Sequence, residues 1–310
     1  EPVMLELKLT TDTTEPQIVD ANVLRGVESM TVVIKPQGKP AREFTPFGRY
    51  CYLPDNVVLY PGESIYAPLS VSAGLNGWDI ADPGRYLLQV ALHRDVEDLI
   101  SNELYLRVAP PRSYEDELIA QEVFTEDVGR VLAVRGSEVL SSANDVLRRV
   151  VDRLDDRRIA IHAAVALAAP EAKEYKVLTT DPTTGAGLQV TTRDAKPQEA
   201  RQLLDQALTS RRDDAAETLG HIGYLRETDA ASEFLAEAGD PSAAAETQSA
   251  AYETLSNRTV GDRKVLSSVL DAVARKRDQY EEMAKPAKPR STRAKSARSK
   301  STRSRSKPTK

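Results

Sequence analysis

Two adjacent prolines, Pro110 and Pro111, divide the chain into two parts whose apolar residues follow different periods. Proline fixes φ, donates no backbone hydrogen bond and disfavours helix in the residue before it, so the pair predicts an extended linker. Before the prolines, apolar and polar residues alternate, whereas after them apolar residues recur every three or four positions. These periods are typical of strands and of amphipathic helices. The sequence therefore predicts an all-β part followed by an all-α part.

The N-terminal part contains short runs with the alternation of half-buried strands. In the first run, Leu5, Leu7 and Leu9 alternate with Glu6 and Lys8. Turn-forming Pro and Gly residues separate it from the runs that follow. Those runs are Gln17–Leu24, Met30–Lys35, Arg49–Leu53, Ser64–Ser72, Arg85–Arg94 and Glu103–Val108. About seven short strands before the linker are typical of an immunoglobulin-like β-sandwich.

A pentapeptide at the start of one predicted strand, Asp82-Pro83-Gly84-Arg85-Tyr86, supports this interpretation. In the strand, Tyr86, Leu88 and Val90 share one face. The segment resembles the tyrosine corner of immunoglobulin-like domains, in which a Tyr hydroxyl bonds to the backbone a few residues upstream. Leu88 stands where an antibody domain has its second cysteine. The resemblance implies an immunoglobulin-like fold for residues 1–109, and it carries no function.

After the linker, apolar residues at helical spacing predict a series of helices. Ser137 precedes the first pattern and has the side chain of an N-cap residue. The predicted helices are Ser137–Leu154, Arg158–Ala169, Pro197–Leu208, Asp214–Tyr224, Asp229–Ala238, Ser242–Leu255 and Lys264–Met283. Thr179–Asp194 is predicted to form a long loop or a small hairpin. The predicted organisation is a sandwich (1–109), a linker with short helices (110–136), an α-helical domain (137–283) and a tail (284–310).

The helical pair around Gly239 has small residues that allow close packing. Ala231–Ala238 leads through Gly239, a natural C-cap, into an Ala-rich helix. The pair resembles the helical hairpin of tetratricopeptide-type repeats. No second copy follows at the period of about 34 residues that such repeats require. We therefore expect an irregular helical bundle, with a loose helical repeat as the alternative.

Charge is distributed very unevenly along the chain. The last 26 residues contain eleven basic side chains and no acidic one, which leaves 31 basic and 47 acidic side chains, a net charge of −16, in residues 1–284. The basic residues are Lys285, Lys288, Arg290, Arg293, Lys295, Arg298, Lys300, Arg303, Arg305, Lys307 and Lys310. Without aromatic or large aliphatic residues, this tail is predicted to be disordered. We expect it to attract nucleic acid or another polyanion without base specificity. The alternatives are a solubilising tail and one that binds the acidic body of its own chain.

Residue types that carry catalysis and metal binding are scarce and scattered. The one cysteine, Cys51, excludes an internal disulfide and a cysteine-rich zinc site, and its apolar neighbours favour a buried thiol. His93, His162 and His221 follow no metal-ligand spacing. The sequence has no nucleophile-elbow motif and no phosphate-binding loop motif. We therefore expect no catalytic residue, no cofactor and no metal.

One loop of the N-terminal part is a candidate binding site. Gly74–Gly84 contains the single tryptophan, Trp78, between Gly77 and Asp79, with Asn76 nearby. Asp79 and Asp82, with Asn76 beside them, would supply oxygen ligands that suit calcium, and an exposed Trp78 would suit a recognition contact. The alternative is structural, with aspartates that cap turns and a tryptophan that closes the end of the sandwich.

These observations favour a non-catalytic binding or scaffold protein with an unidentified protein partner. The alternative is the C-terminal accessory region of a larger enzyme, such as a secreted one, whose catalytic domain precedes residue 1. A third hypothesis is an enzyme that uses carboxylates in a cleft between the two parts. The lack of disulfides favours a cytoplasmic location, and no apolar stretch is long enough to insert into a membrane.

Overall fold

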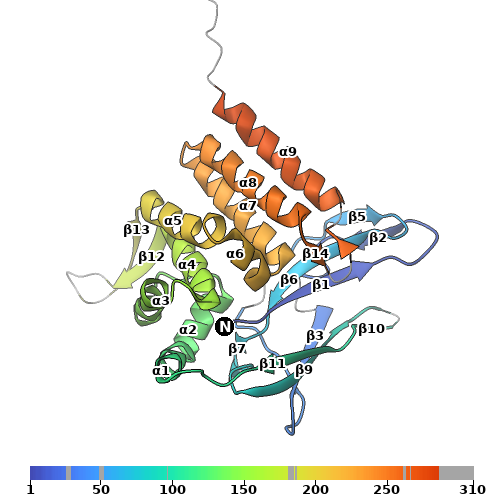
Figure 1. Ribbon diagram of the computed structural model, residues 1–310, viewed down its shortest axis with the longest axis horizontal. Helices are drawn as coiled ribbons and strands as arrows, with labels where there is room; N and C mark the ends of the chain where they lie inside the picture. Colours follow the sequence, from blue (N-terminus) through green and yellow to red (C-terminus); the bar gives the residue numbers. More distant parts are fainter. Residues whose placement is uncertain are drawn as a thin grey trace, which may run out of the picture.

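The computed structural model describes residues 1–25, 29–48, 52–95, 97–180, 185, 187–260, 263–265 and 267–285. Strands are the main regular structure of the N-terminal part and helices that of the C-terminal part (Figure 1). The mixed strand and helix content predicted from the sequence is therefore confirmed. Cys51 and residues 286–310 of the tail lie outside the described residues.

The N-terminal strands form several antiparallel sheets. Their bounds are β1 Met4–Thr10, β2 Gln17–Asp20, β3 Met30–Pro36, β4 Arg42–Glu43, β5 Asn56–Leu59, β6 Ser64–Ser70, β7 Ala73–Gly74, β8 Gly77–Trp78, β9 Gly84–Leu92, β10 Leu99–Ile100 and β11 Leu104–Val108. In the largest sheet, β9 pairs with β3 on one side and with β10 and β11 on the other, and β4 pairs with β3. The remaining pairs are β1 with β6, β2 with β5 and β7 with β8.

The strand predicted at Arg49–Leu53 is wrong for those of its residues that the structure describes. Tyr52 and Leu53 lie outside any strand, residues 49–51 are not among those described, and the strand of this region is β5. Pro54 lacks the N–H that strand pairing uses and restricts the residue before it. The chain therefore enters β5 only after Pro54, and Leu53 is left 87% exposed.

One apolar cluster joins the β1–β6 pair to the largest sheet. It contains Leu5 and Ala67 from the pair and Ile34 and Leu88 from β3 and β9, all buried. At the corner that precedes β9, the Tyr86 hydroxyl donates a hydrogen bond to the carbonyl oxygen of Asp82 at 2.7 Å.

The C-terminal part consists of helices with two short hairpins. The helices are α1 Tyr114–Val123, α2 Glu126–Ala133, α3 Ser141–Arg153, α4 Arg158–Glu171, α5 Pro197–Leu204, its π-helical continuation η2 Asp205–Thr209, α6 Arg212–Leu219, α7 His221–Glu237, α8 Pro241–Ser256 and α9 Ser267–Ala284. The hairpins are β12 Tyr175–Thr180 with β13 Leu188–Arg193, and β14 Thr259–Val260 with β15 Arg263–Lys264. In Figure 1, α7, α8 and α9 lie side by side, and α4 runs through the middle of the helical part. Across the described residues, no helix combines the length and the apolar character needed to span a bilayer.

Several predicted helix boundaries are wrong, and the predicted gap between Tyr224 and Asp229 lies inside α7. Asp214–Tyr224 is not one helix, because the chain breaks between α6 and α7 at Gly220, where φ is +74°. A Cβ at Gly220 would lie 2.9 Å from the carboxyl carbon of Glu6, so only glycine fits there. Ser137 is not the N-cap of α3, which begins at Ser141; instead the Ser137 hydroxyl accepts a hydrogen bond from the backbone N–H of Val139 at 3.3 Å.

Two hydrogen bonds are among the contacts that join the strands to the helices. Glu6 on β1 accepts a hydrogen bond from the backbone N–H of Ile222, in the first turn of α7, at 2.6 Å. Trp78 on β8 donates from its indole N–H to the carbonyl oxygen of Thr125, just before α2, at 2.8 Å. The Trp78 ring also meets the Phe124 ring edge to face, with centroids 4.9 Å apart. These contacts fix β1 against α7 and β8 against the start of α2.

Candidate functional site

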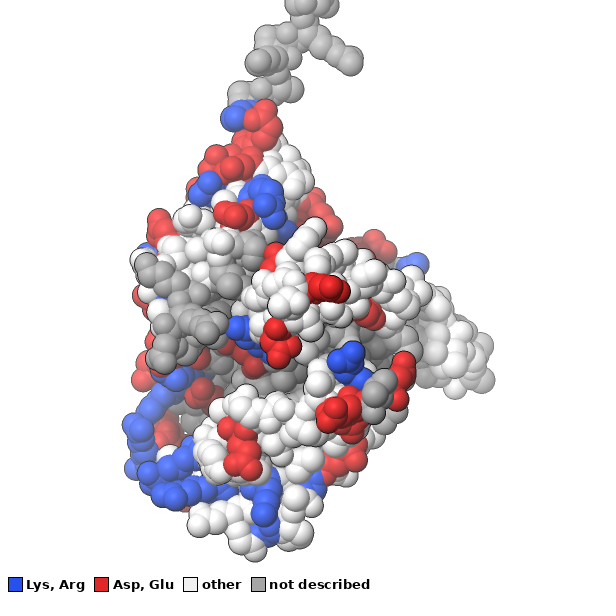
Figure 2. Space-filling model, turned by 90° about the vertical axis from the view of Figure 1, so that its right-hand side faces the viewer, with Lys and Arg blue, Asp and Glu red and all other residues white. Residues whose placement is uncertain are grey.

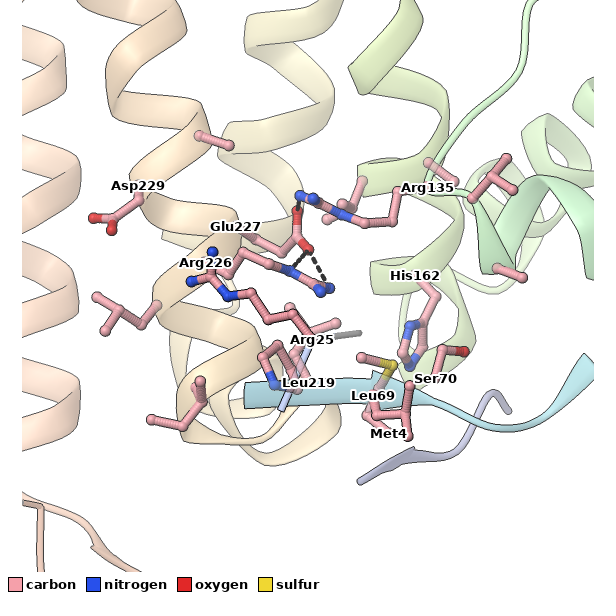
Figure 3. A pocket seen from close by; sticks show the side chains of 18 of the residues that line it. Met4, Arg25, Leu69, Ser70, Arg135, His162, Leu219, Arg226, Glu227 and Asp229 are labelled. Carbon is pink, nitrogen blue, oxygen red and sulfur yellow. Dashed lines mark hydrogen bonds and ion pairs between the residues drawn. The ribbon is translucent and has the colours of Figure 1, made fainter. Parts of the chain in front are cut away.

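A pocket of about 830 Å³ lies where the strands meet the helices. Its walls come from β1, β6, the loop after β4, the end of α2, and helices α4, α7 and α9. Figure 3 shows Met4 and Leu69 on the strand side facing His162 of α4 and Arg226 of α7. Apolar side chains therefore line the pocket together with a small group of charged and polar ones.

A buried carboxylate flanked by two arginines forms part of the wall. Glu227 of α7 has a side chain only 5% exposed. One of its oxygens, Oε1, accepts from Arg226 Nε at 3.1 Å and from Nη2 at 2.9 Å, and the other, Oε2, pairs with Arg135 (Figure 3). Burial lowers the pKa of Arg226, and the neighbouring Glu227 opposes that effect. Two guanidinium groups thus share one carboxylate and leave one positive charge in excess.

Arg135 reaches this position through an unusual turn at the end of α2. Its φ is +63°, and it is the one residue other than glycine with a positive φ in the part of the chain that the structure describes. The backbone N–H of the next residue, Gly136, donates to Val131 at 2.8 Å. A Cβ on Gly136 would lie 2.6 Å from the carbonyl oxygen of Ala166, so the chain must pass close to α4 there. A left-handed conformation costs a non-glycine residue about 1–2 kcal/mol.

His162 brings an unpaired polar group to the pocket. It belongs to α4 and is 8% exposed, and in Figure 3 its ring points toward Met4 and Ser70. Its Nε2 atom has no hydrogen-bond partner within the described structure. Burial lowers the pKa of His162 to about 3, so the imidazole is neutral near pH 7. A neutral imidazole has one donor and one acceptor, and buried polar atoms are rarely left without partners.

Two further charged residues of the pocket, Asp229 and Arg25, differ in whether a partner neutralises their charge. Asp229 pairs with Lys276 Nζ at 2.7 Å and accepts from Gln248 Nε2 at 2.9 Å, which ties α7 to α9 and α8. Arg25 is exposed, and its side chain has no partner among the residues that the structure describes. Arg25 is therefore a free cation at the edge of the pocket.

The loop proposed from the sequence lies at another place. Trp78 is half-buried against α2, and Asn76 is exposed in the turn between β7 and β8. The Asp79 side chain is fully buried and pairs with Arg42 Nε at 3.0 Å, and burial raises its pKa. Over the described ranges, no group of three or more His, Cys, Asp or Glu side chains is placed to hold a metal. Of the tail residues, the structure describes Lys285, which pairs with Glu282 in the last turn of α9.

Sequence reasoning did not single out the pocket. Arg135 and Glu227 are 92 positions apart, and Glu6 and Ile222 are 216 apart, so no local motif connects these residues. His162 was set aside because it follows no metal-ligand spacing. Its one local signal was the alanine-rich sequence around it, which predicts a helix that is buried on all sides.

The Glu227 carboxylate is engaged at both oxygens, and the His162 ring makes no hydrogen bond with Ser70, the hydroxyl drawn beside it. The chain matches no protein-family model, and no curated protein is significantly similar to it in sequence.

Proposed function

We propose that this chain is a non-catalytic binding protein that takes up a ligand in the pocket between its strands and its helices. The observation that carries the proposal is the volume of about 830 Å³ together with the unpaired imidazole of His162. Ligand pockets usually enclose about 300–1,000 Å³ and place a few polar groups among apolar walls. A bound ligand would supply the hydrogen bond that His162 lacks.

The chemistry of the wall supports binding without catalysis. A general base works best when its pKa lies near the operating pH, whereas burial lowers the pKa of His162 to about 3. The Glu227 carboxylate is held by Arg135 and Arg226, so it is not free to accept a proton from a substrate. Both groups are therefore suited to orient a ligand.

The arrangement of strands supports an immunoglobulin-like sandwich as the frame of residues 1–109. Strand β9 lies between β3 and β11, as the strand after a tyrosine corner does in such domains. The hydrogen bond from Tyr86 to Asp82 has the geometry of that corner. We propose that this domain and the helical domain, residues 137–283, present surfaces to a protein partner.

The tail is proposed to supply a separate, nonspecific contact. Its eleven cations without a single acidic residue favour attraction to nucleic acid or another polyanion. This contact is independent of the pocket.

The test of the pocket is ligand-observed NMR with a mixture of small apolar and polar fragments and the full chain. Ser70 lies on β6 and its side chain lines the pocket (Figure 3). In Ser70→Phe the added ring should block the pocket and remove saturation transfer to the fragments. The matched control Ser70→Ala should bind them as the unaltered protein does. Fragment binding that is equal in all three proteins, or absent from the unaltered one, would contradict the proposal.

A further inference from the structure

We infer that the ligand of the pocket is the C-terminal end of a peptide with an apolar last residue, whose carboxylate binds Arg25 and Arg226 and whose amide binds His162. This inference rests on the proposed function and deepens it. It follows from three observations: the excess of positive charge, the unpaired imidazole and the apolar side chains of the pocket.

The charged groups of the pocket favour a single negative charge on the ligand. The cations are Arg25, Arg135, Arg226 and Lys276, and the anions are Glu227, Asp229 and Glu233. Lys276 is neutralised by Asp229, and Glu227 neutralises one of its two arginines. The resulting excess of one positive charge matches a carboxylate better than a dianionic phosphate. Guanidinium groups also bind carboxylates through paired N–H donors, which favours this class of ligand.

The unpaired imidazole favours an amide beside that carboxylate. The unpartnered Nε2 atom of neutral His162 is a donor or an acceptor according to the tautomer, and a peptide group offers a complementary partner for either form. The apolar residues Met4, Leu69 and Val165 also line the pocket. A carboxylate, an amide and an apolar side chain occur together at the C-terminus of a peptide.

Three matched probes separate these features. N-acetyl-leucine has the carboxylate and the amide, N-acetyl-leucinamide lacks the charge, and 4-methylpentanoate lacks the amide. By NMR titration of the full chain, N-acetyl-leucine should bind about tenfold more tightly than N-acetyl-leucinamide, since a hydrogen bond to a charged group is worth about that factor. It should bind about fivefold more tightly than 4-methylpentanoate, which lacks a hydrogen bond between neutral groups. Equal affinity of N-acetyl-leucine and N-acetyl-leucinamide would overturn the inference while the proposed function stands. Failure of all probes and fragments to bind would remove both.

Two variants assign the groups to residues. Arg25→Gln should remove most of the preference for N-acetyl-leucine over N-acetyl-leucinamide. Arg107→Gln is the matched control, because Arg107 is likewise exposed and without a side-chain partner in the described structure, and it should retain the preference. His162→Phe should weaken binding of N-acetyl-leucine but leave that of 4-methylpentanoate unchanged. A preference that survives Arg25→Gln overturns the assignment even if His162→Phe does not fold.

A longer probe distinguishes a peptide from a free N-acylated amino acid. The pocket of about 830 Å³ has room for more than one residue. N-acetyl-alanyl-alanyl-leucine should therefore bind more tightly than N-acetyl-leucine. Equal affinity would assign the pocket to a free N-acylated amino acid and would overturn the inference that the ligand is a peptide.

Discussion

At the scale of single residues, burial decides what the polar side chains of the pocket do. His162 sits on α4 among small apolar residues, so its neutral form is favoured, and burial lowers its pKa to about 3. Burial also favours the neutral form of Asp79, and for an acid this raises the pKa, while the neighbouring Arg42 opposes the rise.

The Tyr86 hydrogen bond was predictable from five consecutive residues. The missing partner of His162 was not, because it depends on everything that encloses α4.

The pKa of His162 predicts a pH dependence of stability. An unfolded histidine takes up a proton near pH 6.5, whereas the folded one does so only near pH 3. Above pH 6.5 both states are neutral and the residue contributes no pH dependence. As the pH falls from 6.5 to 5.0, the unfolded state gains the proton, so His162 should lower the free energy of unfolding by about 2 kcal/mol.

Urea denaturation of the unaltered protein and of His162→Phe at pH 7.5 and pH 5.0 measures this effect. Carboxylates titrate in both proteins, so the difference between them isolates His162. Parallel pH profiles would show that the imidazole is not buried as described.

At the scale of secondary structure, elements with a strong period were predicted within a few residues of their bounds. Examples are β3, predicted at Met30–Lys35 and observed at Met30–Pro36, and α4, predicted at Arg158–Ala169 and observed at Arg158–Glu171. Helices α1 and α2 were anticipated only as short helices within 110–136, since α1 is mostly exposed and α2 contains Gly129. The break at Gly220 was not predictable, because its cause is a contact with Glu6 on β1.

That contact predicts different costs for two glycine substitutions. Gly220 has φ +74° and ψ 167°, a region nearly restricted to glycine, and its Cβ would strike Glu6. Gly239 has φ +87°, but a Cβ there would meet no atom within 4 Å. Gly239→Ala should therefore lower the free energy of unfolding by about 1 kcal/mol and Gly220→Ala by about 3 kcal/mol.

Urea unfolding of both variants at one pH gives the comparison. Equal losses would mean that Glu6 yields to the added methyl group. A change in the slope of the unfolding free energy against urea concentration would indicate instead that the folded or the unfolded state has changed in compactness.

At the scale of the whole molecule, the charges on the surface of the body bear on which partner the basic tail binds. The body has a net charge of −16, but Figure 2 shows acidic and basic side chains interspersed over the upper, helical end of one face and basic ones gathered at its lower edge. This face of the body therefore carries cations as well as anions. This pattern favours an external polyanion over the body as the partner of the tail.

The tail should give the protein a salt-dependent affinity for duplex DNA. Full-length protein is compared with a full-length variant in which the ten Lys and Arg residues of 286–310 are replaced by Gln. The unaltered protein should bind at low salt, with log affinity falling against log salt by about 0.9 for each phosphate neutralised. The variant should not bind.

Fluorescence anisotropy with a labelled duplex at several salt concentrations measures both. Absence of binding by the unaltered protein at low salt would favour association of the tail with its own acidic body. Equal binding by the two proteins would assign the contact to residues outside the tail.

The position of Trp78 has an optical consequence. It is the only tryptophan of the sequence, and it lies where β8 meets the segment before α2, edge to face with Phe124. The intrinsic tryptophan emission of the protein therefore originates at the joint between its strands and its helices. Circular dichroism, by contrast, is dominated by the helices. Followed together during unfolding, the two signals tell whether the joint opens before the helices melt or at the same moment.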